Sequence, residues 1–191
     1  MQTWRRGAAD VQAERVKMEV PLTQFMADVH ERGLRRIPGV AVFPHPGADS
    51  TPIALRQLAQ AADGVHEGIV IVNIVNRNVP HVRHVERASV RRVGHPGDGV
   101  WHIDYSVGFN DSQDVPRALL WAQSKAIDVD LDPESVLYFL SSLRVQGRDV
   151  PRLGAWRKAL FLWLLHSAAN RTLVFHLPPE RTVVLGGQLT L

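Results

Sequence analysis

The sequence of 191 residues has no cysteine, few aromatic residues and no long apolar run. Without cysteine the chain can form no disulfide, no thiolate metal site and no cysteine nucleophile, which fits a reducing compartment. The longest apolar run, residues 159–165, is far shorter than the roughly 20 residues that a membrane-spanning helix needs. With 45% hydrophobic and 21% charged residues, the composition is typical of one globular domain with its own core.

Basic residues slightly outnumber acidic ones, which gives a formal net charge of +3 and a sequence pI near 9.8. The tightest basic groups are the pairs at 5–6, 35–36 and 91–92, and acidic residues lie within a few positions of each. A nucleic-acid surface usually carries a basic stripe with interleaved aromatic residues, which this sequence lacks. We therefore expect a solvated surface and no nucleic-acid partner. Trp4, Arg5 and Arg6 lead into a charged stretch, which is unlike a secretory signal.

Residues 1–33 form a charged, weakly amphipathic stretch in which apolar residues are sparse. The apolar positions are Val11, Val16, Leu22, Phe25, Met26 and Val29, and Pro21 interrupts them. The pattern predicts one or two short helices in a lead-in arm that lies outside the core. The domain itself is then expected to span residues 34–191.

Strand and helix patterns alternate along the rest of the chain. Apolar, β-branched runs predict strands over 34–43, 68–75, 82–93, 100–107, 135–140, 172–177 and 181–191. The run at 68–75 is almost continuously hydrophobic, as in a strand covered on both faces, and residues 95–99 are typical of a hairpin turn.

Three helices are expected between these strands. Residues 51–62 begin with Thr51 as N-cap and Pro52 at the first helical position, and Gly64 ends them. Residues 115–126 have Asp114 as N-cap, and residues 155–169 carry Trp156 and Leu160 on one apolar stripe. The sequence therefore predicts a single α/β domain, a mixed β-sheet with helices packed on it.

Nine histidines and several carboxylates show no spacing that is typical of a catalytic or metal site. His81 and His84 lack zinc-type partners nearby, and the acidic run at 128–134 lacks the glycine and final glutamate of an EF-hand loop. Glycine-rich phosphate loops and the nucleophile elbow are absent as well. The sequence predicts no catalytic residue, no metal site and no cofactor, and it argues against an enzyme. A small hydrolase or metalloenzyme is the least favoured alternative.

Short strings along the whole chain are informative through their order and spacing. They lie at 4–7 (WRRG), 36–43 (RIPGVAVF), 66–67 (HE), 78–80 (NVP), 108–109 (GF), 114–116 (DVP), 138–140 (YFL), 156–157 (WR), 160–161 (LF), 178–181 (PPER) and 185–188 (LGGQ). Together they resemble the cytoplasmic C-terminal domain of the Kup/HAK/KT family of potassium uptake transporters.

The resemblance implies a regulatory or assembly domain on the cytoplasmic side of the plasma membrane. Its partner would be the membrane-spanning unit of the same transporter, which moves potassium together with protons; a second copy of the domain is a further partner. Residues 1–33 would then be a juxtamembrane arm, with Trp4, Arg5 and Arg6 at the membrane interface, as the aromatic-belt and positive-inside rules expect. Expressed alone, the chain would be a soluble cytoplasmic protein.

The chain departs from the family pattern at several polar positions. Gly68 follows the His-Glu pair where a basic residue is usual, and Ser141, Ser142 and Leu143 replace Ser-Arg-Glu. Val184 occupies a position that is commonly acidic, and residues 166–168 replace Arg-Asn-Ala. A regulator that binds through those positions in the family would not find them here.

The alternative function is a nucleotide-sensing module, since some relatives in the wider group respond to cyclic di-AMP. The loop before the first predicted helix offers His45, Asp49, Ser50 and Thr51 beside a helix N-terminus, whose N–H groups suit a phosphate. A capped helix start with no ligand explains the same residues. The sequence leaves both open.

Overall fold

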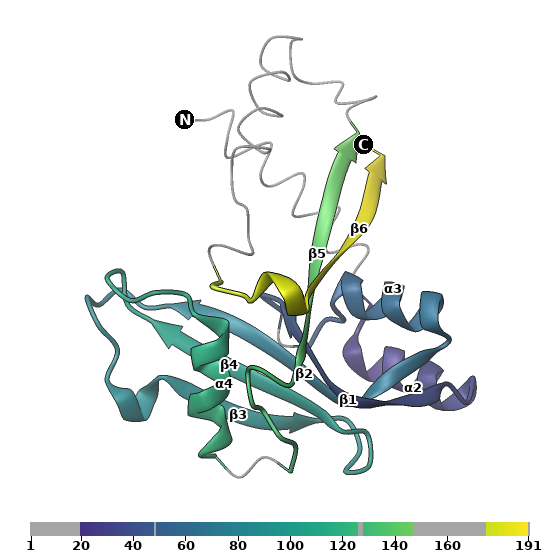
Figure 1. The fold of residues 1–191 in the computed structure, drawn as a ribbon, viewed down its shortest axis with the longest axis horizontal. Coiled ribbons are helices and arrows are strands. Elements are labelled where there is room, and N and C mark those ends of the chain that lie inside the picture. Colours follow the sequence, from purple (N-terminus) through teal and green to yellow (C-terminus); the bar gives the residue numbers. More distant parts are fainter. Residues whose placement is uncertain (1–19, 48, 126–127, 147–174, 191) are drawn as a thin grey trace.

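The computed structural model describes residues 20–47, 49–125, 128–146 and 175–190. They form a six-stranded sheet of order β3-β4-β2-β1-β5-β6 (Figure 1). The strands are β1 (Arg35–Pro44), β2 (Gly64–Asn76), β3 (Ala88–Val93), β4 (Val100–Val107), β5 (Leu137–Gln146) and β6 (Thr182–Thr190). Strand β3 is antiparallel to β4 and the other neighbouring strands are parallel, which confirms the predicted mixed sheet.

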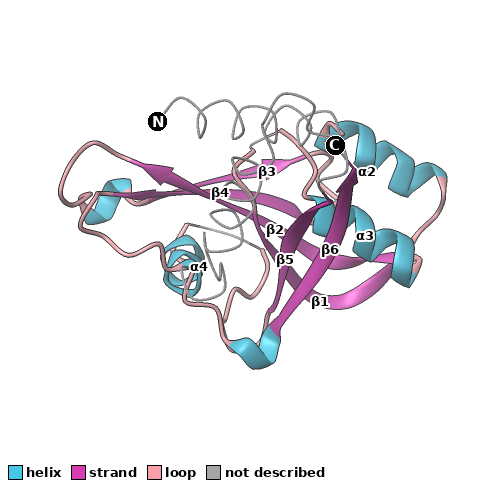
Figure 2. Ribbon diagram, turned by 90° about the horizontal axis from the view of Figure 1, so that it is seen from above, coloured by secondary structure: helices cyan, strands magenta, loops and turns pink. Residues whose placement is uncertain are grey.

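Helices cover both faces of this sheet (Figure 2). Helices α2 (Leu22–Glu31) and α3 (Ile53–Ala62) lie on one face, and α4 (Val115–Gln123) lies on the other. Two short 3-10 helices, η1 (His84–Glu86) and η2 (Pro179–Arg181), precede β3 and β6. Among the described helices, none is long and apolar enough to cross a membrane.

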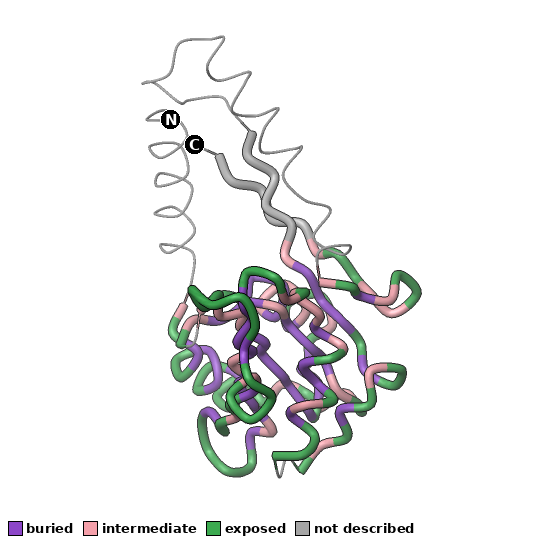
Figure 3. The backbone as a smooth tube through the Cα atoms, turned by 90° about the vertical axis from the view of Figure 1, so that its left-hand side faces the viewer, coloured by how far each residue is buried: buried purple, intermediate pink, exposed green. Residues whose placement is uncertain are grey.

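The sheet separates two apolar cores, and its central strands are the most deeply buried part of the molecule (Figure 3). The α4 face buries, among others, Val70, Val72, Ile103, Tyr105, Leu119 and Tyr138. The opposite face buries Phe43, Leu55, Ile69, Ile71 and Phe139 together with the apolar side of α2. Strand β2 contributes to both cores, which explains the nearly continuous hydrophobic run that the sequence shows there.

The expectation that residues 1–33 lie outside the core is wrong for α2. Leu22, Phe25, Met26 and Val29 of this helix are at most 8% exposed and belong to the second core. Their i, i+3, i+4, i+7 spacing places them on one face, and each buried side chain contributes about 1.5–3 kcal/mol. Pro21 does not interrupt this helix, because it stands at the N-cap. The boundary between residues 33 and 34 itself stays a prediction.

Local signals predicted the starts of α3 and α4 to within two residues, whereas α4 ends at Gln123, earlier than the predicted residue 126. Asp114 caps α4 as expected, since its carboxylate accepts a hydrogen bond of 2.8 Å from the backbone N–H of Arg117. Helix α3 starts later than predicted: Pro52, not Thr51, is its N-cap, and no side chain caps it. Asp63 in the left-handed conformation (φ 46°) ends α3, and Gly64 already belongs to β2.

The last part of the chain is covered only in part. Residues 175–177 are turn and coil, so the expected strand at 172–177 is wrong there, whereas β6 confirms the strand predicted from residue 181. The helix expected at 155–169, with Trp156, Leu160, Trp163 and Leu164, lies outside the described residues. Strands β5 and β6 pair from Tyr138 to Gln146 and project together beyond the rest of the sheet (Figure 1).

Candidate functional site

The carboxyl ends of β1, β2 and β4 lie at the same edge of the sheet, since these strands are parallel. The loops at 45–52, 77–87 and 108–114 leave from this edge. The chain turns from β1 into α3 on one face and from β4 into α4 on the other, so the connections diverge here. In open α/β sheets this edge is where ligands usually bind.

The first of these loops holds the predicted phosphate-binding residues in a tight internal arrangement. His45 is 3% exposed, and its Nε2 lies 2.7 Å from the hydroxyl of Ser50. Thr51 is fully buried, and its hydroxyl has no hydrogen-bond partner among the described residues. Asp49 is exposed and faces Arg91 at 3.5 Å. The structure therefore brings His45 and Ser50 together and leaves only Asp49 well exposed.

The N-terminus of α3 is largely occupied by groups of the chain itself. Pro52 has no N–H, and the backbone N–H of Ala54 donates to the hydroxyl of Ser141 at 3.0 Å. The backbone N–H of Leu55 donates to the carbonyl of Pro52. A phosphate at this helix end would compete with Ser141. The nucleotide site at 45–51 stays a prediction.

The same loop holds the residues that lead into α2. The N–H of Leu22 donates to the carbonyl of Asp49 at 2.8 Å, and the N–H of Thr51 donates to the carbonyl of Val20 at 2.9 Å. Pro21 and Ser50 form an isolated antiparallel bridge. The chain thus arrives at α2 along the carboxyl edge of the sheet.

Polar side chains replace apolar ones on the α2–α3 face as β2 and β4 approach this edge. Asn73 and Asp104 are cross-strand neighbours, and the Asn73 amide donates to the Asp104 carboxylate at 2.7 Å. His102 lies one step earlier on β4, between Ile71 and Arg91, and is fully buried. Neither of its ring nitrogens has a hydrogen-bond partner among the described residues. Burial lowers the pKa of His102, although Asp104 opposes this effect.

Asp111 joins the loop after β4 to the loop after β2. Its carboxylate accepts hydrogen bonds from the backbone N–H groups of Val82 at 3.0 Å and Gly108 at 2.9 Å. It also lies 2.8 Å from Nδ1 of His81 and 3.1 Å from the Arg87 guanidinium. These partners, His81 first, hold the pKa of the Asp111 carboxyl well below its usual range.

A glycine allows the two loops to approach this closely. A Cβ atom on residue 108 would lie 2.4 Å from the carbonyl oxygen of Pro80, so only glycine fits there. The next residue, Phe109, donates its backbone N–H to the carbonyl of Val79 at 2.9 Å. Phe109 and Val79 remain 67% and 42% exposed.

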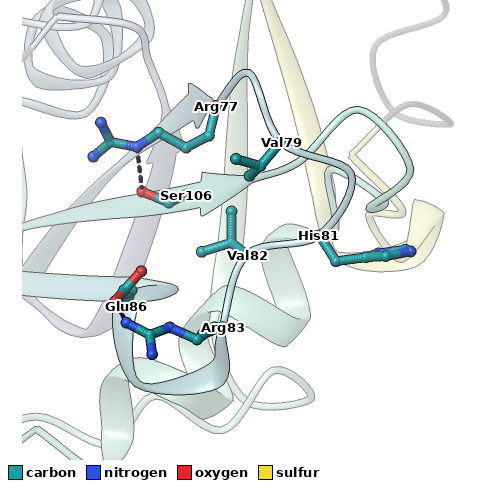
Figure 4. A pocket seen from close by; sticks show the side chains of 7 residues that line it. All are labelled: Arg77, Val79, His81, Val82, Arg83, Glu86 and Ser106. Atoms are coloured by element: carbon teal, nitrogen blue, oxygen red, sulfur yellow. Dashed lines mark hydrogen bonds and ion pairs between the residues drawn. The ribbon is translucent and has the colours of Figure 1, made fainter.

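A cavity of about 520 Å³ opens between the ends of β2 and β4 (Figure 4). Arg77, Val79, His81, Arg83, Glu86 and Ser106 are among its lining residues. The Arg77 Nε donates to the Ser106 hydroxyl at 3.3 Å, and Arg83 pairs with Glu86 at 2.5 Å. Arg77 has no carboxylate partner among the described residues, so the lining keeps a positive charge after these pairs are formed.

Sequence reasoning missed this cavity and the Asp111 contacts. Arg77 follows directly after the most apolar strand, and Asp111 follows Gly108 after the next parallel strand; both positions mark a carboxyl edge. The expected interface residues Trp4, Arg5 and Arg6 lie outside the described residues. Within the described part of the chain, no three histidine, aspartate or glutamate residues group as metal ligands would.

Residues 38–191 match the model of a protein family described as the K+ potassium transporter C-terminal domain. The chain belongs to this family. The similarity to relatives extends over all 191 residues, so it includes α2 as well as the matched domain. No solved structure matches the chain.

Three relatives carry the name "Probable potassium transport system protein Kup". That of Cutibacterium acnes is 43% identical over the whole of this chain, that of Corynebacterium glutamicum (strain R) 35%, and that of Acidiphilium cryptum 32%. In each case the chain spans about 30% of the relative's length.

Proposed function

We propose that the chain is the regulatory and assembly domain of a potassium uptake transporter, on the cytoplasmic side of the membrane. The observation that carries this proposal is the match of the whole chain to about 30% of proteins named as potassium transport systems. The remaining length of those relatives is enough for a membrane unit that moves potassium together with protons. The domain would act on that unit in cis, without catalysis and without a cofactor.

The fold supports a role in contact and control. Helix α2 is packed into the core, and the backbone of residues 20–22 is hydrogen-bonded to the loop after β1. A displacement of the chain that precedes α2 would therefore move the loop after β1 at the carboxyl edge of the sheet. A change in that loop would in turn move the chain that precedes α2. A second copy of the domain is a further partner in this proposal.

The first experiment is an immunoblot of fractionated source cells with an antibody against this domain. A band much larger than 21.3 kDa in the membrane fraction supports a transporter in cis. A soluble band of the size of this chain overturns it. The domain's role is then tested by rubidium uptake in potassium-uptake-deficient cells that carry the whole gene or the gene without this domain. Unchanged uptake with an unchanged amount of membrane protein would refute a regulatory or assembly role.

Nucleotide sensing at His45, Asp49, Ser50 and Thr51 is the second candidate. The buried Thr51 hydroxyl without a partner at the start of α3 is the observation that favours it. Titration calorimetry with cyclic di-AMP and with ATP tests it directly. Heat that disappears in Ser50→Ala supports the site, and no heat at high micromolar ligand refutes it.

A further inference from the structure

We propose that the cavity beside Arg77 binds the phosphate headgroup of an anionic phospholipid, while Val79 and Phe109 enter the membrane interface next to it. This proposal rests on the proposed function, because it takes the membrane to be the one that holds the transport unit. It adds a ligand site and a membrane-facing surface, which we call the headgroup edge. The headgroup edge consists of the loops at 77–87 and 108–111.

The charge of the cavity suits an anion. Arg77 keeps its two terminal nitrogens free of any carboxylate among the described residues, and Ser106 holds its Nε at 3.3 Å. Figure 4 shows this contact between two residues that line the cavity. A guanidinium presented in this way can donate two hydrogen bonds to a phosphate.

The second arginine of the cavity is only partly neutralised by its neighbour. Glu86 accepts from Arg83 through a single pair at 2.5 Å, and Arg83 remains highly exposed. The ring of His81 is 63% exposed, with Asp111 at its Nδ1. The lining therefore combines two arginines and one histidine with one exposed carboxylate. A volume of about 520 Å³ lies in the range of small-molecule sites and accommodates a lipid headgroup.

Exposed apolar side chains flank the cavity. Val79 lines it, Phe109 is bonded to Val79 through the backbone, and Val85 lies between Arg83 and Glu86 with 75% exposure. They stand as separate side chains on loops and do not form one flat apolar face. Membrane-surface binding combines apolar side chains at the headgroup boundary with nearby basic residues, whereas protein interfaces have a contiguous buried centre.

The direction of the chain agrees with this orientation. The family is a C-terminal domain, so the rest of a longer protein would precede residue 1. The chain reaches α2 along the carboxyl edge of the sheet, through the bonds of Val20 and Leu22 to the loop after β1. The headgroup edge leaves the sheet on this same side. An anionic membrane surface attracts each nearby arginine, so two arginines and an inserted Phe give reversible binding.

The test is sedimentation of the 191-residue chain with vesicles of phosphatidylcholine alone or mixed with phosphatidylglycerol. We expect binding to the mixed vesicles only. Arg77→Gln and Phe109→Ala should each reduce the partition coefficient about fivefold or more, since 1 kcal/mol corresponds to roughly this factor. The matched controls are Arg117→Gln and Leu120→Ala on α4, which are also exposed and should bind like the parent. Thermal melting checks that all four variants fold.

Four other outcomes would overturn the proposal. Equal losses in test and control variants would mean general electrostatic adsorption, and absence of binding to phosphatidylglycerol vesicles would remove the site. If calorimetry shows that glycerol phosphate binds as tightly as the vesicles do, the cavity beside Arg77 is a site for a free phosphate. If the domain binds the transport unit in detergent without lipid, and Phe109→Ala abolishes this binding, the headgroup edge is a protein interface. A soluble native band with intact vesicle binding would refute only the transporter proposal.

Discussion

Nδ1 of His81 lies 2.8 Å from the Asp111 carboxylate, and this contact joins the loop after β2 to the loop after β4. With the backbone N–H groups of Val82 and Gly108 and the guanidinium of Arg87, Asp111 fixes the position of the headgroup edge. The Asp111 carboxylate is only 6% exposed and accepts hydrogen bonds from both loops, so it holds the two loops together.

Replacement of Asp111 is expected to destabilise the protein. Asp111→Ala leaves two backbone donors without their acceptor and removes one of the acceptors of the Arg87 guanidinium, so the midpoint of unfolding should fall. Urea unfolding measures the change, with the exposed neighbour Ser112→Ala as control. Because its folded pKa is lowered, Asp111 stabilises the fold above about pH 4, and this contribution is lost as the pH falls below that value. The parent should lose stability more steeply than Asp111→Ala in that range.

His66 and His102, two of the buried histidines, should make the fold sensitive to mild acid. Burial lowers the pKa of both His66 and His102 below the ordinary value of 6.5. Between that value and the lowered one, the unfolded chain binds more protons than the folded one, so stability falls as the pH drops below about 6.5. Melting temperatures between pH 8 and pH 5, on the order of one measurement per half unit, follow this loss.

His102→Leu separates the two histidines in this experiment. The ring of His102 has no hydrogen-bond partner among the described residues, so an apolar side chain of similar volume should be close to neutral in stability at pH 8. The variant should also lose part of the acid sensitivity. The exposed His95→Gln is the control and should keep the full pH profile. An unchanged profile in His102→Leu would contradict the prediction.

His45→Ala should destabilise the loop after β1. In an exposed loop this substitution would change the stability by no more than about 0.5 kcal/mol, but His45 is buried and bonded to Ser50. We now expect a cost of about 1–2 kcal/mol, since one hydrogen bond and the packing of the ring are lost. Chemical unfolding measures it, and Pro46→Ala, at an exposed position in the same loop, provides the comparison.

Met26→Ala tests whether α2 belongs to the folded domain. Met26 is 2% exposed and packs into the core beneath α2, so its truncation should cost about 2–5 kcal/mol. Thr23→Ala, on the exposed side of the same helix, should change stability little. Equal unfolding midpoints for the parent and Met26→Ala would mean that α2 does not belong to the folded core.

Much of the fold was predictable because its signals are local. The apolar run of β2 predicted a strand covered on both faces, and Asp114 with Pro116 predicted the start of α4. The hairpin between β3 and β4 followed from glycine and proline between two alternating runs. The order of short strings along the chain was enough to suggest the family, since it needs no three-dimensional information.

The role of α2 was not predicted correctly, and the burial of His45 was not predicted. The apolar stripe of α2 was visible, but whether a stripe is buried depends on the partner surface, which β1, β2 and α3 form together. The same holds for His45: it is buried, its backbone N–H donates to the carbonyl of Val72 on β2, and its ring contacts Ser50.

The sequence by itself determined the elements, the class of fold and the family, because these depend on neighbouring residues and on their order. Only the tertiary structure decided which side chains meet. Arg77 and Ser106, His81 and Asp111, and Asn73 and Asp104 are about 30 residues apart in sequence, and each pair is joined by the parallel pairing of β2 with β4 and the loops that follow. Strand register and loop closure set such contacts, and both depend on the whole chain at once.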